Sequence, residues 1–265
     1  MSTIQYDANY GNFQTILYEE IRREAFGEDI GQNSWVTADE QDRFIGWLGL
    51  AVGKSLLDVA CGAGGPVLRI AALTGCTVTG ADILKNAIST ARFLANERSL
   101  ESRAEFRIVD AGKQLPFSEA SFDAITCIDA INHLPDRRRV LADWTRLLKP
   151  CGRVLFTDPT VVTGPLCNAE IAVRSSSGFY LFVPCGYDER IIADCGLRLV
   201  ICEDRTSNMA EIAERRKNAR ESRSSALRGI EGDAGYESQQ EFLSMAAKLA
   251  RDGRLSRFVY VAEKA

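Results

Sequence analysis

The amino-acid sequence predicts a doubly wound α/β domain, in which helices cover both faces of a mostly parallel β-sheet. From residue 55 onward, short runs rich in β-branched residues alternate with amphipathic segments. Each run is nearly continuous in apolar residues, as expected for strands that are buried on both faces. Regular alternation of such strands with helices is typical of the α/β class.

Seven short apolar segments are expected to be strands. They are residues 55–59, 76–80, 105–109, 122–128, 153–157, 197–203 and 257–262. Between them, apolar residues recur at helical spacing and form three helix faces. These faces are made of Val67, Leu68, Ala71 and Ala72; of Leu84, Ala87, Ile88, Ala91 and Ala95; and of Val140, Leu141, Trp144, Leu147 and Leu148.

Three segments lie outside this alternation. Residues 1–52 are rich in aromatic side chains and predict an N-terminal helical lid ahead of a main domain at 53–265. Within the main domain, insertions at about 159–187 and 205–253 interrupt the strand pattern. Open α/β sheets bind ligands beyond the carboxyl ends of their strands, so these insertions are expected to be further lid segments. The charge run 214–223 is interpreted as a solvated helix face.

Length and composition are those of an ordinary globular protein. The chain has 265 residues, of which 46% are hydrophobic and 26% are charged, enough for one large domain. No apolar stretch approaches the roughly 18–20 residues needed to cross a bilayer. A formal net charge of −4 argues against a nucleic-acid-binding face. The sequence begins without the basic segment and apolar run of a signal peptide, so we expect a cytoplasmic protein.

The cysteines and the single histidine do not form a metal-binding pattern. None of the eight cysteines pairs with another as CxxC, and His133 is not grouped with any of them. Scattered cysteines in a chain without an export signal are expected to be buried small hydrophobic residues. We therefore expect no metal cofactor.

The most informative motif is the glycine-rich turn after the first predicted strand. Asp58 ends that strand, Gly62 and Gly64 follow, and Pro66 suits the first turn of a helix. The spacing does not fit a dinucleotide site, because the third glycine of GxGxxG would fall at Val67. The Asp58 carboxylate would also repel a diphosphate. A ligand with a positive group and no phosphate fits better, and S-adenosylmethionine (SAM) has both properties.

Two further acids follow the next predicted strands. Asp82 is placed to accept hydrogen bonds from both ribose hydroxyls, and Ile83 to pack on the adenine ring. Asp110 is placed to accept from the adenine amino group. Each acid alone is explained by helix capping, but capping does not explain three acids at successive strand ends.

With these motifs the sequence resembles the class I SAM-dependent methyltransferases. The resemblance is carried by residues 58–64, Asp82, 109–111, 122–123 and 148–152. It implies a Rossmann-like, seven-stranded sheet of order 3-2-1-4-5-7-6 with an antiparallel last strand, and SAM contacts that include Ala60, Ala111 and Ile128. Ala60 and Cys151 stand where the family has glycine, so we expect that Ala60 does not need a positive φ.

The methyl acceptor is expected at the ends of the fourth and fifth strands. Asp129 and His133 are four residues apart, so one helical turn would place them on one face. His133 has an ordinary pKa near neutrality, as a general base requires. Asp158 is placed to orient its imidazole. The alternative is a structural histidine that caps the helix predicted near Pro135.

The segment Asp129-Ala-Ile-x-His133-Leu is similar to that of phosphoethanolamine and related amine N-methyltransferases, and residues 26–35 loosely resemble their SAM-covering segment. This resemblance implies SAM contacts from Ser34 and Trp35. It also implies a tyrosine latch on the histidine, for which Tyr6, Tyr10 and Tyr18 are all available. Tyr10 is in addition assigned to the SAM site. The expected reaction is N-methylation of a small-molecule amine held near Asp129.

Other functions stay open. The chain can methylate oxygen or carbon of an anionic or prenylated metabolite, with Glu170 or Asp158 as the base and Arg174 as an anion-binding residue. Glu170 and Arg174 are equally explained as an i, i+4 pair on an exposed helix. A non-catalytic SAM-binding protein and an NAD-dependent oxidoreductase are the remaining alternatives.

Overall fold

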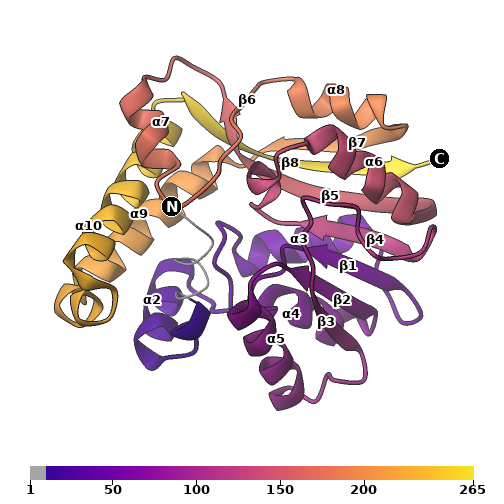
Figure 1. The fold of residues 1–265 in the computed structure, drawn as a ribbon, viewed down its shortest axis with the longest axis horizontal. Helices are drawn as coiled ribbons and strands as arrows, with labels where there is room; N and C mark the ends of the chain where they lie inside the picture. Colours follow the sequence, from indigo (N-terminus) through magenta and orange to yellow (C-terminus); the bar gives the residue numbers. More distant parts are fainter. Residues whose placement is uncertain (1–9) are drawn as a thin grey trace.

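The computed structural model describes residues 10–265 and contains a twisted sheet in the order β3-β2-β1-β4-β5-β8-β7 (Figure 1). The strands are β1 (Ser55–Val59), β2 (Thr77–Asp82), β3 (Ala104–Ile108), β4 (Phe122–Cys127), β5 (Leu148–Val162), β6 (Val183–Pro184), β7 (Leu197–Asp204) and β8 (Leu255–Lys264). Strands β1 to β5 pair in parallel, and β8 runs antiparallel to β5 and β7. The predicted order is confirmed. The two-residue β6, which pairs with β5, was not predicted.

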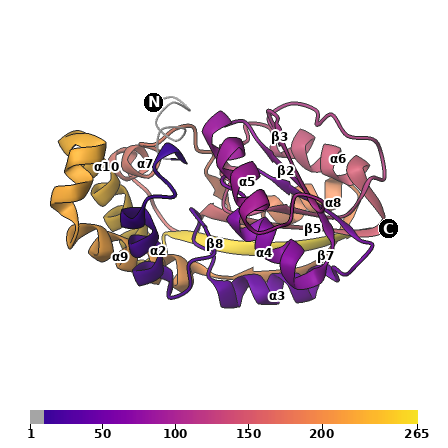
Figure 2. The same ribbon diagram turned by 90° about the horizontal axis from the view of Figure 1, so that it is seen from below.

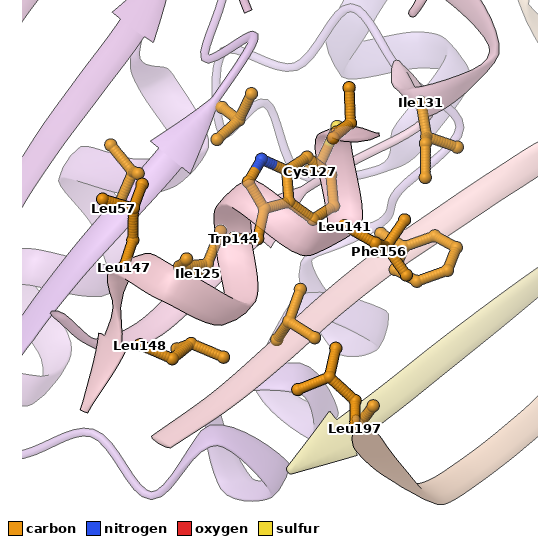
Figure 3. Packing of buried hydrophobic residues seen from close by; sticks show 14 of the residues in the cluster. Leu57, Ile125, Cys127, Ile131, Leu141, Trp144, Leu147, Leu148, Phe156 and Leu197 are labelled. Atoms are coloured by element: carbon orange, nitrogen blue, oxygen red, sulfur yellow. The ribbon is translucent and has the colours of Figure 1, made fainter. Parts of the chain in front are cut away.

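Helices cover both faces of this sheet, as predicted. On one face lie α3 (Ala38–Leu48), α4 (Gly65–Thr74) and α5 (Lys85–Glu97), and on the other lie α6 (Arg137–Leu147) and α8 (Tyr187–Asp194). Trp144 of α6 is fully buried and packs among Leu57, Ile125 and Leu147 (Figure 3). The two apolar cores hold the parallel strands rigidly, so the loops at their carboxyl ends have fixed positions.

A separate group of helices lies beyond one end of the sheet (Figures 1 and 2). This helical layer consists of α2 (Ile16–Phe26), α7 (Asn168–Arg174), α9 (Thr206–Glu221) and α10 (Ser224–Arg251). It has its own core, in which Phe26 and Trp35 pack with Met209, Ala213 and Phe242. The interpretation of 214–223 as a solvated face is wrong in part. Arg220 is buried and pairs with Glu231 of α10 at 2.7 Å.

The cysteines differ from the expectation of burial. Only Cys61, Cys76 and Cys127 are buried. The other five are partly or fully exposed, namely Cys151, Cys167, Cys185, Cys195 and Cys202, and all eight are free thiols. Within residues 10–265 there is no cluster of three or more metal-ligating side chains. Nor does any helix in that range have the length and apolarity to cross a membrane.

The expectation for Ala60 is wrong. Ala60 has a φ of +58° and Cys151 a φ of +59°, so both lie in the left-handed region that favours glycine. The chain keeps the glycine-type turn at both positions and accepts the steric cost of a Cβ, on the order of 1 kcal/mol for each residue.

Replacing either residue by glycine is therefore expected to stabilise the protein. Cys151→Gly and Ala60→Gly should each raise the melting temperature by about 2–4 °C, as measured by calorimetry, because each relieves about 1 kcal/mol of strain. Ala51→Gly is the matched control, because Ala51 is exposed and not among the positive-φ residues; it should leave the melting temperature unchanged or lower. Equal effects at positions 51 and 151 would contradict this explanation.

Candidate active site

A cavity of about 570 Å³ opens at the carboxyl ends of β1, β2 and β4, and is called here the strand-end cavity. Its volume lies in the range of small-molecule sites. Ten residues assigned to SAM from the sequence line it: Tyr10, Ser34, Asp58, Ala60, Gly62, Asp82, Ile83, Asp110, Ala111 and Ile128. Two others do not. Trp35 faces a second cavity, and Gly64 lies beneath the turn, where a Cβ would come within 2.8 Å of Ala91 and 2.9 Å of Phe106.

Asp58 is a buried acid that has no cationic partner among residues 10–265. It is 7% exposed, and its one hydrogen bond comes from the Thr126 hydroxyl at 2.7 Å. Burial, with a smaller contribution from the negative charge of Asp82, raises the pKa of Asp58 to about 7. A ligand that brings a positive group to this carboxylate would remove the cost of ionising it.

Asp82 is held in place by the backbone. Its carboxylate accepts hydrogen bonds from the amides of Gly62 at 2.8 Å and Leu84 at 2.9 Å. Two carboxylate oxygens offer about four acceptor positions, and these two amides occupy two of them. The phenol of Tyr10 lies against the glycine turn, since a Cβ on Gly62 would be 2.5 Å from its hydroxyl oxygen.

The residues of the strand-end cavity match the chemical groups of SAM. The strand-end cavity supplies a buried carboxylate for an ammonium group, an acceptor pair for a ribose and the half-exposed Ile83 for an adenine face. Asp110 is less directly available, since it accepts from the Gly112 amide at 2.9 Å and lies 3.4 Å from Lys113.

A second cavity of about 270 Å³ lies between the sheet and the helical layer, and is called here the helical cavity. Aromatic side chains form much of its wall: Phe13, Tyr18, Phe26, Trp35, Tyr180 and Phe242. Among the residues that the structure describes, five line both cavities: Asn33, Ser34, Asp129, His133 and Ser177. The two cavities therefore meet at His133 and Asp129.

His133 is held as a neutral base with a defined tautomer. Its Nδ1 lies 2.9 Å from the Phe179 carbonyl oxygen. A carbonyl only accepts, so we assign the proton to Nδ1 and the lone pair to Nε2. Burial, assisted by the charge of Arg174, lowers the pKa of His133 below its usual value, so the imidazole is neutral at pH 7.

Asp129 adjoins His133 but does not share a helical turn with it, which corrects the expectation. Asp129 has a φ of +52°, and the short 3₁₀ helix Ile131–His133 begins after it. Its carboxylate accepts from Arg257 Nε at 2.6 Å, from Thr157 Oγ1 at 2.7 Å and from the Trp35 amide at 2.8 Å. Arg257 is fully buried and also pairs with Glu40 at 2.8 Å. The charge of Asp129 is thus neutralised within the protein.

Asp158 and Glu170 do not have the predicted positions. Asp158 is fully buried and bonds Arg137 and Thr160, not the imidazole of His133. Glu170 lines neither cavity; its hydrogen bonds from Arg254 lower its pKa to about 2, which makes it a poor base. The alternative of an exposed Glu170–Arg174 pair is also wrong. Arg174 is buried with its guanidinium 4.5 Å from the Phe242 ring centre.

The three tyrosines that could form the latch on His133 differ in position. Tyr18 donates to Glu231 at 2.6 Å within the helical cavity, whereas Tyr10 lines the strand-end cavity. Tyr6 lies outside the described residues.

Sequence reasoning missed Asn132 and Arg257. Asn132 is 1% exposed and lines the helical cavity, and its amide Nδ2 lies 3.4 Å from His133 Nε2. Its Oδ1 has no hydrogen-bond partner in the described part of the chain. Adjacency to His133 was the available signal for Asn132. The sequence held no local signal for Arg257, because it lies 128 positions from Asp129.

A mostly parallel α/β sheet with buried acids at the carboxyl ends of its strands is an arrangement that suits a donor with a cationic group, such as SAM. Residues 50–179 match a family model described as a methyltransferase domain. The chain belongs to the class I SAM-dependent methyltransferases, and SAM is the methyl donor of this family.

Named relatives include enzymes that methylate different atoms. The chain is 29% identical over 199 residues to 27-O-demethylrifamycin SV methyltransferase of Amycolatopsis mediterranei, covering 71% of this chain and 73% of the relative. It is 39% identical over 126 residues to methyltransferase GfsG of Streptomyces halstedii, covering 48% and 45%. With phosphoethanolamine N-methyltransferase 3 of Arabidopsis thaliana it shares 28% identity, covering 80% and 41%. The chain therefore spans less than half of the last two relatives.

Solved structures share the fold over nearly the whole chain. The cyclopropane synthase MmaA2 from Mycobacterium tuberculosis superposes with a TM-score of 0.82 at 21% identity, covering 98% of both chains. A putative sarcosine dimethylglycine methyltransferase from Galdieria sulphuraria gives 0.79 at 19% identity, covering 97% of this chain and 98% of that one.

The raised pKa of Asp58 predicts a pH-dependent affinity for S-adenosylhomocysteine (SAH), which carries the same ammonium group as SAM. In the free protein Asp58 takes up a proton below about pH 7, and the ammonium binds only the ionised form. The dissociation constant measured by calorimetry should therefore rise about tenfold per pH unit below pH 7.

Asp58→Asn is the matched control. It should weaken SAH binding more than about tenfold at pH 8, because the buried charge pair is lost, and it should abolish the dependence on pH. A wild-type affinity that is constant from pH 5 to pH 8 would contradict the role of Asp58.

Proposed function

We propose that this protein transfers a methyl group from SAM, bound in the strand-end cavity, to a small molecule bound in the helical cavity. The observation that carries the proposal is the junction of the two cavities at His133 and Asp129. Methyl transfer is an in-line displacement that depends on alignment and exclusion of water. The helical layer and the insertions at 159–187 and 205–253 serve as lids over this junction.

The chain's own residues hold the donor from three sides. Asp58 receives the ammonium group, Asp82 the ribose hydroxyls, and Ile83 packs on the adenine. SAM supplies an electrophilic methyl group on a positively charged sulfur. Tyr10 lies over the glycine turn and helps to close the cavity from the N-terminal side.

His133 acts as the general base. With the proton on Nδ1, the lone pair lies on Nε2, which faces the Asn132 amide nitrogen at 3.4 Å and is the atom that takes the proton the acceptor loses. The lowered pKa keeps the imidazole neutral at physiological pH, which is the form that accepts a proton. Asn132 beside it offers a carboxamide oxygen to a donor group of the acceptor.

We favour a hydroxyl acceptor on an apolar or aromatic molecule over the amine expected from the sequence. The carboxylate of Asp129, which was expected to hold the amine, is neutralised by Arg257. Aromatic walls in the helical cavity suit a ring system. The name of the rifamycin relative also describes O-methylation. N-methylation remains the second candidate, because the Asp129–His133 segment resembles the amine N-methyltransferases.

The acceptor is identified by incubating the protein with isotopically labelled SAM and fractionated metabolite extracts, then finding the compound that gains a labelled methyl group. We expect the methyl on oxygen, as read from the product by NMR. A methyl on nitrogen would favour the second candidate. The absence of transfer to any fraction, with SAM bound, would indicate a non-catalytic SAM-binding protein.

With that acceptor, His133→Ala should lower kcat about 10²–10⁴-fold, the usual contribution of a general base. SAH affinity should stay within about twofold of the wild-type value, because Asp58 holds the amino group and Asp82 the ribose of SAH. Glu170→Gln is the control for the rejected base and should leave kcat unchanged. Full activity of His133→Ala, or an equal loss in Glu170→Gln, would overturn the assignment.

A further inference from the structure

The segment that orients His133 belongs to the wall between the two cavities. It follows α7, and its Ser177 lines both cavities, Phe179 the strand-end cavity and Tyr180 the helical cavity. The Phe179 carbonyl accepts a hydrogen bond from His133 Nδ1–H, and the Tyr180 ring packs edge-on against the imidazole, with 4.6 Å between the ring centres. The tautomer of the base therefore depends on where this segment lies.

The position of the segment is fixed at Leu181, two residues further on. The Leu181 amide donates to the Asn132 carbonyl at 2.8 Å. Its own carbonyl lies 2.9 Å from Thr160 Oγ1 and 3.0 Å from Arg137 Nη2. Two residues of chain span at most about 7 Å, so a displacement of the Leu181 peptide is passed to the Phe179 carbonyl with little slack.

Behind Leu181 lies a buried cluster that the methyl-transfer step does not use. Arg137, Asp158 and Asp188 are all buried to within 1% exposure, and Arg137 Nη1 lies 2.5 Å from Asp158 and 2.9 Å from Asp188. Thr160 Oγ1 also lies 2.7 Å from Asp158 Oδ1, so its single hydroxyl proton is shared between that carboxylate and the Leu181 carbonyl. Burial of an arginine with two carboxyl groups adds little to stability when an apolar core could replace them. A role in holding the Leu181 carbonyl gives the cluster a function.

We infer that Thr160 and Arg137 are positioning residues for the general base. By holding the Leu181 carbonyl they keep the Phe179 carbonyl on Nδ1 of His133, and so keep the lone pair on Nε2. The inference rests on the proposed function in taking His133 as the base. It also gives Asp158 a role two contacts away from the imidazole, in place of the direct contact expected from the sequence.

The chain offers an unusually clean probe, because it contains one histidine. In ¹⁵N-labelled protein without a histidine tag, both ring nitrogens of His133 are observed without overlap. At pH 8 with SAH bound, the wild type should show the proton on Nδ1. A wild-type proton on Nε2 would overturn the inference before any variant is made.

The matched pair of variants is Thr160→Val, which removes the hydroxyl at nearly constant volume, and Thr160→Ser, which keeps it. In Thr160→Val the two ¹⁵N shifts should move toward each other, as the Nδ1–H form loses its fixed acceptor, and kcat on the identified acceptor should fall about tenfold. Thr160→Ser should restore the wild-type spectrum. SAH affinity should change less than about twofold in both, since Thr160 does not line the strand-end cavity.

A purely structural role for Thr160 would lower the melting temperature of Thr160→Val and leave the imidazole spectrum unchanged, and that result would overturn the inference. If Thr160→Val does not fold, the wild-type tautomer and the Thr160→Ser spectrum still test it. Failure of the proposed function would be seen in a different measurement, as full activity of the His133→Ala variant. The two failures are therefore distinguishable.

Discussion

A carboxylate buried without a counter-charge is the constraint around which this site is arranged. Asp58 stands at the end of β1, and among residues 10–265 the Thr126 hydroxyl is its one hydrogen-bond donor and no cation pairs with it. Burial raises its pKa to about 7. Asp129, beyond the end of neighbouring β4, is a buried acid of the opposite kind, since Arg257 neutralises it. An acid that pairs with a cationic side chain has a structural role, whereas an acid without a counter-charge in a cavity suits a cationic ligand. The contrast between Asp58 and Asp129 therefore distinguishes the proposed donor site from the residues that support it.

The parallel sheet and the helical layer have separate tasks in this arrangement. Two apolar cores fix the strand ends, and with them the acids that line the strand-end cavity. The helical layer supplies the aromatic wall of the helical cavity. His133 stands where these parts meet, and its tautomer is set by a backbone carbonyl from the segment after α7. In the proposed function, the donor, the base and the acceptor are therefore held by three different parts of the chain.

Local patterns in the sequence predicted the strands and the acids at their ends, and the family resemblance predicted the sheet order. Ten of the twelve residues assigned to SAM line the strand-end cavity. These features depend on spacing within a few residues, or on strand order. The errors concern side-chain partners distant in sequence. Glu170 pairs with Arg254, 84 positions away, and Asp129 with Arg257, 128 positions away. The prediction for the backbone conformation of Ala60 was wrong for a different reason. A residue type indicates a preferred backbone conformation, but tertiary packing can impose another.

The most direct test of the account is a crystal structure of the protein with SAH. We expect the SAH amino group within hydrogen-bond distance of Asp58, the ribose hydroxyls on Asp82, and the sulfur directed toward the junction beside His133. SAH bound elsewhere, or with its amino group away from Asp58, would contradict the account.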